Sequence, residues 1–311
     1  MTALPGGIRR LTFPLPLEID HVHCYLLPGD DGWTLVDTGL GLPDAAARWE
    51  RAMRELNAPV ARIVVTHFHP DHAGGGEDAQ ALTGAQVLQG EQDYAQCLRA
   101  WGSEDWSERL TAYLRAHGLP EPVAAELRHE SRTFSPLIRF ARDPEPLLDG
   151  DEVDGWRVLE LPGHADGHLC LVRDGVLVAG DHLLGMITPT VGLYPESRPD
   201  PLADYQASLR RTIELAPRLA LPGHGEPVAD PAARARELLE HHRCRLDETA
   251  AAVGAEPRSA YDVSLALFGT NLDASGRRFA LAETLAHLER LVRVGRAARR
   301  GDGGNVSYTA A

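Results

Sequence analysis

Lysine is missing from the 311-residue sequence, in which all 31 basic residues are arginine. An enzyme that forms a Schiff base through lysine, or a P-loop that places a lysine against a phosphate, is therefore excluded. Cysteine is scarce, with four residues that form no Cys-x-x-Cys pair: Cys24, Cys97, Cys170 and Cys244. This spacing argues against a disulfide scaffold or a cysteine-rich zinc site and predicts isolated buried or surface thiols.

Long apolar runs are missing as well. No stretch approaches the roughly 18 apolar residues of a membrane span, so we expect no transmembrane helix and no membrane partner. Arg9 and Arg10 are followed by Pro14 and Pro16 rather than by an apolar segment, which argues against a signal peptide. Together these absences predict a cytoplasmic protein.

Positive charge is in deficit, with 31 arginines against 45 acidic residues and a net charge of −14. The deficit lies in residues 1–230, which hold 19 arginines against 35 acids, whereas residues 231–311 hold 12 against 10. A strongly acidic main body is a poor match for a polyanion. We therefore expect a small-molecule substrate and no nucleic-acid partner, and the sequence leaves the oligomeric state open.

The order of predicted elements indicates an α/β domain over residues 1–230. Strands are expected at 22–27, 33–36, 61–66, 85–88, 156–161, 169–173, 176–179 and 219–221, with helices at 44–56 and 202–215. Residues from about 91 to 142 are predicted to form an insertion of helices and loops, which contains five aromatic residues: Trp101, Trp106, Tyr113, Phe134 and Phe140. These aromatics either line a lid over the site or form the lid's own small core.

A second, mainly helical domain is predicted over residues 231–311. Asp230 and Pro231 form an N-cap and N1 pair that starts a helix reaching about Val253. Further helices are expected at 259–268 and 277–291, followed by a glycine-rich hairpin near 295–308.

The strongest motif is His67-x-His69-x-Asp71-His72, directly after the predicted strand at 61–66. Imidazole nitrogens and carboxylate oxygens are ligands for zinc and related divalent metals, and four such residues within six positions indicate a metal site. Three further candidates follow later predicted strands: His164, Asp181 and His224.

The motifs HFHPDH, PGH, GDH and PGHG, in this order over about residues 20 to 230, resemble the metallo-β-lactamase superfamily. The resemblance implies an αββα sandwich with the metal site at one edge of its two sheets. It implies that His67, His69 and His164 bind a first metal, that Asp71, His72 and His224 bind a second, and that Asp181 bridges both. The ligand pattern is similar to that of the glyoxalase II-like branch, and residues 231–311 resemble the winged-helix tail of the lactamase-β-like branch.

The activity that this resemblance implies is a dinuclear metal-dependent hydrolysis. Two divalent ions, Zn²⁺ first with Mn²⁺ or Fe²⁺ as alternatives, would share a hydroxide that attacks an ester, thioester or lactone carbonyl. Asp181 and Asp71 are the predicted catalytic carboxylates. Asp181 would bridge the two metal ions, and Asp71 would help to orient the reacting groups or to relay protons.

Three other functions stay open at this stage. The first is a metal-dependent phosphodiesterase or endoribonuclease, which the winged-helix-like tail favours and the acidic body disfavours. The second is a mononuclear iron sulfur dioxygenase, which needs only two histidines and one aspartate. The third is a binding protein without catalysis.

Weaker candidates surround these motifs. Asp37 is expected to hold a ligand histidine, and His168 and His182 to support ligands or pack beside them. His21 and His23 are expected to be structural. His241, His242 and Cys244 are expected on a solvated helix face. Tyr194 is considered as a contact to a substrate oxyanion, and Arg277, Arg278 and residues 296–300 as phosphate contacts.

Overall fold

The computed structural model describes residues 1–16, 19–301 and 304–311. Its first sheet has seven strands in sequence order, with antiparallel pairs from β1 to β4 and parallel pairs from β4 to β7. The strands are β1 (Thr2–Ala3), β2 (Arg9–Pro14), β3 (His21–Pro28), β4 (Trp33–Val36), β5 (Val60–Val65), β6 (Gln86–Gln89) and β7 (Glu145–Pro146).

The second sheet has five strands in the order β12-β11-β10-β9-β8, in which only β11 and β12 are a parallel pair. These strands are β8 (Glu152–Val153), β9 (Trp156–Glu160), β10 (Leu169–Arg173), β11 (Val176–Gly180) and β12 (Leu219–Pro222). One apolar cluster joins the inner faces of both sheets, with Val36 and Val64 from the first and Val158 and Leu171 from the second. The sheets therefore form a sandwich.

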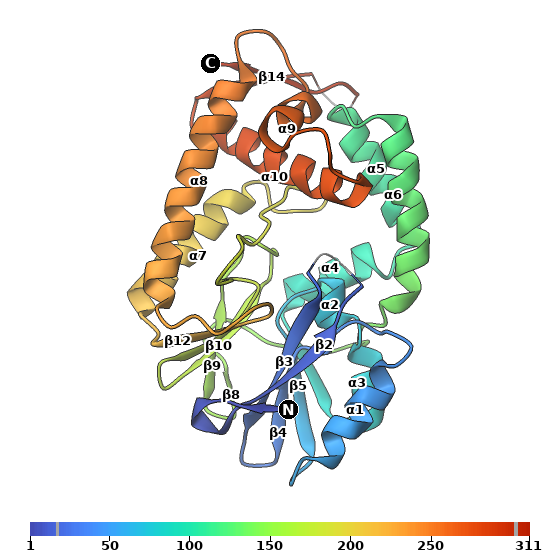
Figure 1. Ribbon diagram of the computed structural model, residues 1–311, viewed down its shortest axis with the longest axis vertical. Helices are drawn as coiled ribbons and strands as arrows, with labels where there is room; N and C mark the ends of the chain where they lie inside the picture. The colour runs from blue at the N-terminus through green and yellow to red at the C-terminus, as the bar shows by residue number, and fades with distance from the viewer. Residues whose placement is uncertain (17–18, 302–303) are drawn as a thin grey trace.

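Helices cover both outer faces of this sandwich. Next to the first sheet lie α1 (Ala45–Arg54), α2 (Pro70–Ala73), α3 (Gly76–Thr83) and α4 (Glu91–Ala100). Against the second sheet lies α7 (Pro201–Leu215), with Leu202, Tyr205 and Leu209 buried among strand residues. The predicted αββα architecture is confirmed (Figure 1).

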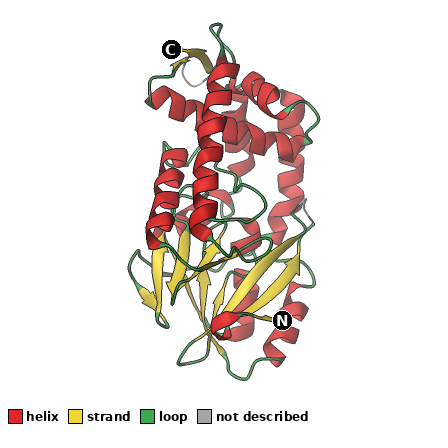
Figure 2. Ribbon diagram, turned by 60° about the vertical axis from the view of Figure 1, so that its left-hand side comes forward, coloured by secondary structure: helices red, strands yellow, loops and turns green. Residues whose placement is uncertain are grey.

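The remaining helices extend from the sandwich to one end of the molecule, as Figure 2 shows. They are α5 (Trp106–Ala116), α6 (Glu121–Phe134), α8 (Pro231–Val253), α9 (Ala260–Phe268) and α10 (Ala274–Arg293), beside the hairpin β13 (Ala297–Arg300) and β14 (Ser307–Ala310). Two short 3-10 turns are also present: Pro5–Gly7 and Ser135–Leu137. None of the helices within the described residues is long and apolar enough to cross a membrane.

The insertion and the C-terminal helices share one hydrophobic core. Leu110 and Leu114 of α5 pack in the same cluster as Val263 of α9 and Leu285 of α10. Trp106 and Tyr113 join this cluster, whereas Trp101, Phe134 and Phe140 pack on the first sheet's side of the sandwich. The aromatics of the insertion are thus divided between two cores. The sequence analysis had offered either a lid over the site or a separate small core of the lid, and neither describes this division.

Candidate metal centre

The seven candidate ligands follow strands whose carboxyl ends meet at one edge of the sandwich. The histidine motif begins two residues after β5, and Asp37 directly follows the parallel neighbour β4. In the second sheet β9, β11 and β12 run in one direction, because β9 and β11 both lie antiparallel to β10. His164, Asp181 and His224 follow these three strands. Carboxyl ends of strands are where α/β folds place ligands.

We call His67, His69 and His164 the first-site group. One donor atom from each lies within 4.8 Å of the others. His67 Nε2 and His69 Nδ1 converge to 3.0 Å. The rings of His69 and His164 meet edge to face, with centroids 4.5 Å apart. Three imidazoles that converge from two loops form the donor set that suits zinc and its neighbours.

We call Asp71, His72 and His224 the second-site group, whose donor atoms also lie within 4.8 Å of one another. Asp181 lies between the two groups. Its Oδ1 is 3.4 Å from His72 Nε2, and its Oδ2 is 3.3 Å from His224 Nε2 and 3.6 Å from His164 Nε2. One carboxylate therefore faces histidines of both groups, as the sequence interpretation requires of a bridging residue.

The electrostatics of the two groups differ. Burial lowers the pKa values of His67 and His69 well below the usual histidine range, so both imidazoles are neutral and keep a lone pair. At His224 burial acts in the same direction, but Asp181 and Asp71 raise its pKa to about 10. Burial would raise the pKa of Asp71, yet His72 and His224 lower it to about 2. The carboxylates therefore stabilise positive charge at this point of the molecule.

The chemistry of these residues fits divalent cations. His72 Nε2, His164 Nε2 and Asp181 Oδ1 are buried and have no hydrogen-bond partner within the described part of the chain. Buried polar atoms are normally paired, so unpaired ligand-type atoms that face one another indicate a metal. Gly223 makes the close approach possible, because a Cβ there would lie 2.5 Å from Asp181 Oδ1 and 2.6 Å from His72 Cε1.

Asp37 holds the second-site group from behind. Its Oδ2 accepts a hydrogen bond from His72 Nδ1 at 2.8 Å, which leaves Nε2 of that ring free to face Asp181. Thr66 secures Asp37 in turn, because its backbone N–H donates to Oδ1 at 2.8 Å and its hydroxyl donates to Oδ2 at 2.9 Å. Asp37 therefore orients the ring of His72, a candidate ligand.

Backbone carbonyls fix two other candidate ligands. His224 Nδ1 donates to the His21 carbonyl at 2.6 Å, and His164 Nδ1 donates to the Thr190 carbonyl at 2.8 Å. The His21 ring accepts from the Gly225 N–H at 2.9 Å, and His23 Nε2 donates to the Gly225 carbonyl at 2.9 Å. His21 and His23 are thus structural, as expected, and they hold the loop that carries His224.

His168 and His182 separate into two roles. His168 Nε2 accepts the Asp181 backbone N–H at 3.1 Å, and its ring stacks on His67 at 4.8 Å. His182 turns into the core beside α7, where its Nε2 pairs with Thr212 Oγ1 at 2.7 Å. His168 therefore contacts two candidate ligands, Asp181 and His67, whereas His182 packs in the core.

The C-terminal helices hold the loop between Asp181 and α7. Arg234 of α8 donates to the Leu184 carbonyl at 2.8 Å and to the Ile187 carbonyl at 2.9 Å. Arg290 of α10 pairs with Asp200 at 3.0 Å, at the start of α7. Because Thr190 lies in this loop, the C-terminal region supports the surroundings of His164.

One sequence prediction outside the candidate ligands is wrong, and two roles that the sequence left open are not supported. His242 does not lie on a solvated helix face: it is 1% exposed, and its Nδ1 lies 3.3 Å from His287 Nε2. Arg277 cannot reach a phosphate, because it is 3% exposed and donates to the Gly269 carbonyl. Tyr194 packs against the helical core cluster rather than among the ligand residues. Helical periodicity could not reveal these contacts, since α8 and α10 bury polar residues against each other.

Two residues near the candidate ligands have contacts that the sequence analysis did not predict. Asp93 of α4 accepts the Phe68 backbone N–H at 3.0 Å, and Trp101 Nε1 donates to the Phe68 carbonyl at 2.8 Å. Burial raises the pKa of the Asp93 carboxyl well above its usual range. An aspartate in the first turn of a predicted helix is typical of a helix-dipole residue, so nothing in the local pattern singled it out.

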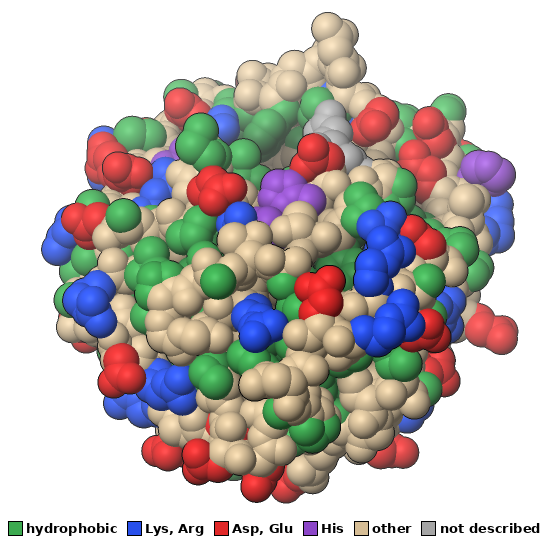
Figure 3. All heavy atoms as spheres, turned by 60° about the horizontal axis from the view of Figure 1, so that its bottom comes forward, with side chains coloured by type: hydrophobic (Ala, Val, Ile, Leu, Met, Phe, Trp, Pro, Cys, Tyr) green, Lys and Arg blue, Asp and Glu red, His purple; other side chains and the backbone are tan. Residues whose placement is uncertain are grey.

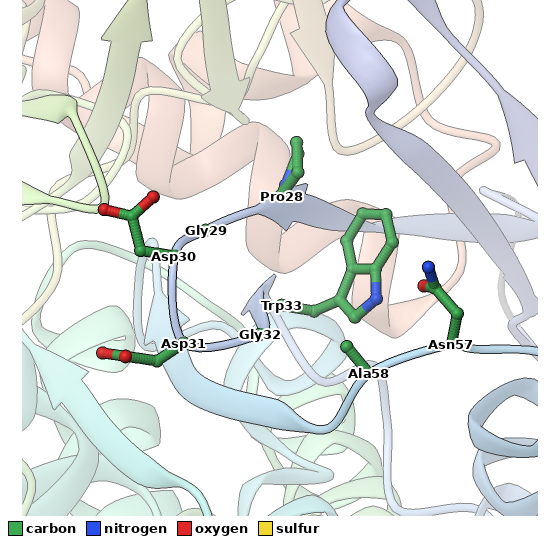
Figure 4. A pocket seen from close by; sticks show the side chains of 8 residues that line it. All are labelled: Pro28, Gly29, Asp30, Asp31, Gly32, Trp33, Asn57 and Ala58. Atoms are coloured by element: carbon green, nitrogen blue, oxygen red, sulfur yellow. The ribbon is translucent and has the colours of Figure 1, made fainter.

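A depression of about 340 Å³ lies elsewhere, at the turn between β3 and β4. Figure 4 shows Trp33 and Asn57 at its sides, with the carboxylates of Asp30 and Asp31 directed away from them. None of the seven candidate ligands lines it.

Comparison with known proteins gives the family. Residues 17–224 match the family model of the metallo-beta-lactamase superfamily, which covers more than half of the chain. The chain belongs to the metallo-beta-lactamase superfamily. Residues 246–311 match a second family model, the metallo-beta-lactamase-like C-terminal domain. This metallo-hydrolase family binds divalent metals, in agreement with the histidine and aspartate cluster.

Individual members of the superfamily are similar to this chain over most of its length. The metallo-beta-lactamase family protein TTHA1429 from Thermus thermophilus is 38% identical, with a TM-score of 0.85 and 99% of both chains covered. The probable metallo-hydrolase YqjP of Bacillus subtilis is 29% identical over 89% of both chains. The atrochrysone carboxyl ACP thioesterase of Claviceps purpurea is 23% identical over 79% of this chain and 66% of its own length.

Proposed function

We propose that this chain is a dinuclear metal-dependent hydrolase of small ester, thioester or lactone substrates. The observation that carries the proposal is the position of Asp181, whose carboxylate faces His164 of the first-site group and both histidines of the second-site group. A site for a single ion would not need the second-site group, which the fold holds in place through Asp37 and His21.

Two divalent ions at such a site supply Lewis acidity and lower the pKa of water toward neutrality. The residues of this chain prepare the site for them. His67 and His69 offer neutral imidazoles because burial disfavours their protonation. Asp181 and Asp71 neutralise positive charge that would otherwise repel across the site. Asp71 Oδ2 lies 3.2 Å from His224 Nε2, where it can orient a polar group of the substrate or accept a proton.

A thioester is the carbonyl substrate we favour. A thioesterase is among the relatives of this chain, although it shares only 23% identity. The chemistry is consistent with this choice, since a metal site that activates water needs no serine, cysteine or lysine nucleophile. Zinc is the ion we propose, because the donor set combines imidazole and carboxylate.

Neither the net charge nor the face seen in Figure 3 supports a nucleic-acid substrate. On the face shown in Figure 3, arginine and acidic side chains are interspersed rather than gathered into one basic surface, and a group of histidine atoms reaches the surface among them. The net charge of −14 opposes binding to a polyanion. We therefore propose a small-molecule partner for this site.

The experiment that tests this proposal is a hydrolysis panel run on protein of known metal content. Thioesters, carboxylic esters, lactones, phosphodiesters and RNA are offered at equal concentration, each with and without a chelator. We expect chelator-sensitive turnover of the carbonyl substrates, with a thioester fastest. Turnover confined to phosphodiesters or RNA, and suppressed by rising salt, would contradict the proposal.

A further inference from the structure

The residue between two of the proposed metal ligands is held on both sides by one helix. Phe68 separates His67 from His69, and its backbone N–H donates to Asp93 Oδ1 at 3.0 Å. Its carbonyl accepts from Trp101 Nε1 at 2.8 Å. Asp93 lies in the first turn of α4 and Trp101 caps its last turn, so the helix spans the peptide groups of Phe68.

Asp93 is itself fixed. It is fully buried, and its second oxygen, Oδ2, accepts from Gln89 Nε2 at 2.6 Å. Its backbone packs against the loop that carries His164, because a Cβ at Gly167 would lie 2.7 Å from Asp93 N. One turn further along α4, Gln96 donates to Asp166 Oδ2 of that loop at 2.8 Å. The helix therefore contacts both loops that supply the first-site group.

The second-site group has separate supports. His72 is held by Asp37 through Nδ1, and its carbonyl accepts from the N–H and hydroxyl of Thr38, each at 2.8 Å. His224 is held by the His21 carbonyl. None of these supports lies in α4. Disturbing the contacts of α4 should therefore affect the two groups unequally.

We propose that Asp93 and Trp101 are positioning residues that set the geometry of the first-site group by fixing the peptide groups of Phe68. This inference rests on the proposed function, since it takes His67, His69 and His164 as metal ligands. Groups that orient metal ligands from outside the coordination shell change metal affinity by about 10- to 100-fold when removed. The expected effect is selective: the first-site ion is bound more weakly, and the second-site ion is not.

The test is a titration of the metal-free full chain with Zn²⁺ in competition with a chelator of known affinity. Wild type should show two binding steps, and the step that His164→Ala removes identifies the first-site group. Asp93→Ala should weaken that step by about 10- to 100-fold and Trp101→Phe by a smaller factor, with the other step within about threefold of wild type. Asp93→Asn should restore most of the affinity, because its amide oxygen can still accept from Phe68 while Gln89 turns its own amide to match.

Two control variants come from the same insertion. Glu91→Ala removes an exposed carboxylate from the same turn of α4 as Asp93. Trp106→Phe is the control for Trp101→Phe, because it replaces a tryptophan that packs in the helical core cluster instead. Both should bind zinc as wild type does. If Asp93→Ala does not fold, Trp101→Phe still tests the inference, because it removes the Nε1–H donor to the Phe68 carbonyl and keeps an aromatic side chain at that position. Hydrogen exchange of wild type adds a test without substitution: the Phe68 amide should be protected.

Equal weakening of both steps, unchanged binding by Asp93→Ala and Trp101→Phe, or fast exchange of the Phe68 amide would overturn the inference. Its failure is distinguishable from failure of the proposed function. A wild-type chain that binds no divalent ion contradicts the function, whereas two ions bound equally well by wild type and both variants contradict only the role of α4.

Discussion

His72 Nδ1 donates a hydrogen bond to Asp37 Oδ2 at 2.8 Å, and the pair joins two neighbouring parallel strands, β4 and β5, at their carboxyl ends. Asp37 adopts a positive φ of 62°, a conformation that asparagine also tolerates. The backbone of the turn therefore permits a substitution that changes only the acceptor.

We expect Asp37→Asn to fold and to bind the second-site ion about 10- to 100-fold more weakly, because an amide in place of the carboxylate orients the His72 ring less firmly. The measurement is the two-step zinc titration, with circular dichroism to verify the fold. Wild-type affinity at both steps would show that Asp37 has no influence on the ligand it contacts.

Asp181→Ala should lose zinc from both groups and reduce turnover by roughly 100- to 1,000-fold, because the carboxylate that faces both groups is gone. The sandwich should still fold, since its core consists of apolar strand residues. The matched control is Glu152→Ala, which removes an exposed carboxylate from β8 of the same sheet. Wild-type turnover by Asp181→Ala at saturating zinc would show that the active site lies elsewhere.

His242→Ala should destabilise the protein without changing the chemistry. The ring is buried between α7, α8 and α10, edge to face with Tyr205 at 5.4 Å and beside His287. Its loss leaves a cavity, which we expect to lower the free energy of unfolding by about 1–3 kcal/mol. His241→Ala, at the half-buried neighbouring position, is the control and should change it by under about 0.5 kcal/mol. Chemical denaturation measures both, and turnover per folded molecule should stay at the wild-type value.

The same histidine predicts a dependence of stability on pH. Burial, with His287, His241 and Arg245 nearby, lowers the pKa of His242 to about 3. The unfolded chain then binds more protons than the native state below about pH 6.5, so stability is present above that pH and is lost as the pH falls toward 3. For one such histidine the loss between pH 7.5 and pH 5 is roughly 2 kcal/mol. Denaturation of metal-free His242→Leu should show a correspondingly smaller loss, and parallel pH curves for variant and wild type would refute this.

Much of the fold followed from local pattern. The strands at Trp33–Val36 and Leu169–Arg173 and the helix at Pro231–Val253 have the bounds that turn residues and capping pairs predicted. The helix expected at 277–291 begins earlier, at Ala274, because Asp273 accepts from the Gly276 N–H and caps it. The hairpin is present as β13 and β14, although its turn residues 302–303 lie outside the described residues.

The site could be predicted to the extent that its residues follow strands. Each candidate ligand sits where a run of apolar residues ends, and strand ends meet at one edge of a layered sheet. What supports the ligands could not be predicted, because Asp93, Trp101 and the His21 carbonyl act through backbone groups of distant segments. The burial of His242 was missed for a related reason: the partner ring, His287, lies on another helix. The domain boundary at residue 230 and the winged-helix assignment stay predictions.

The central claim is that the chain holds two divalent ions between the first-site and second-site groups. Elemental analysis of the purified full chain, reported as ions per chain and compared with His164→Ala and His224→Ala, tests it most directly. We predict close to two ions, mainly zinc, in wild type and a loss of at least one in each variant. A wild-type chain that holds one ion and takes up no second, or variants that retain both ions, would contradict the claim.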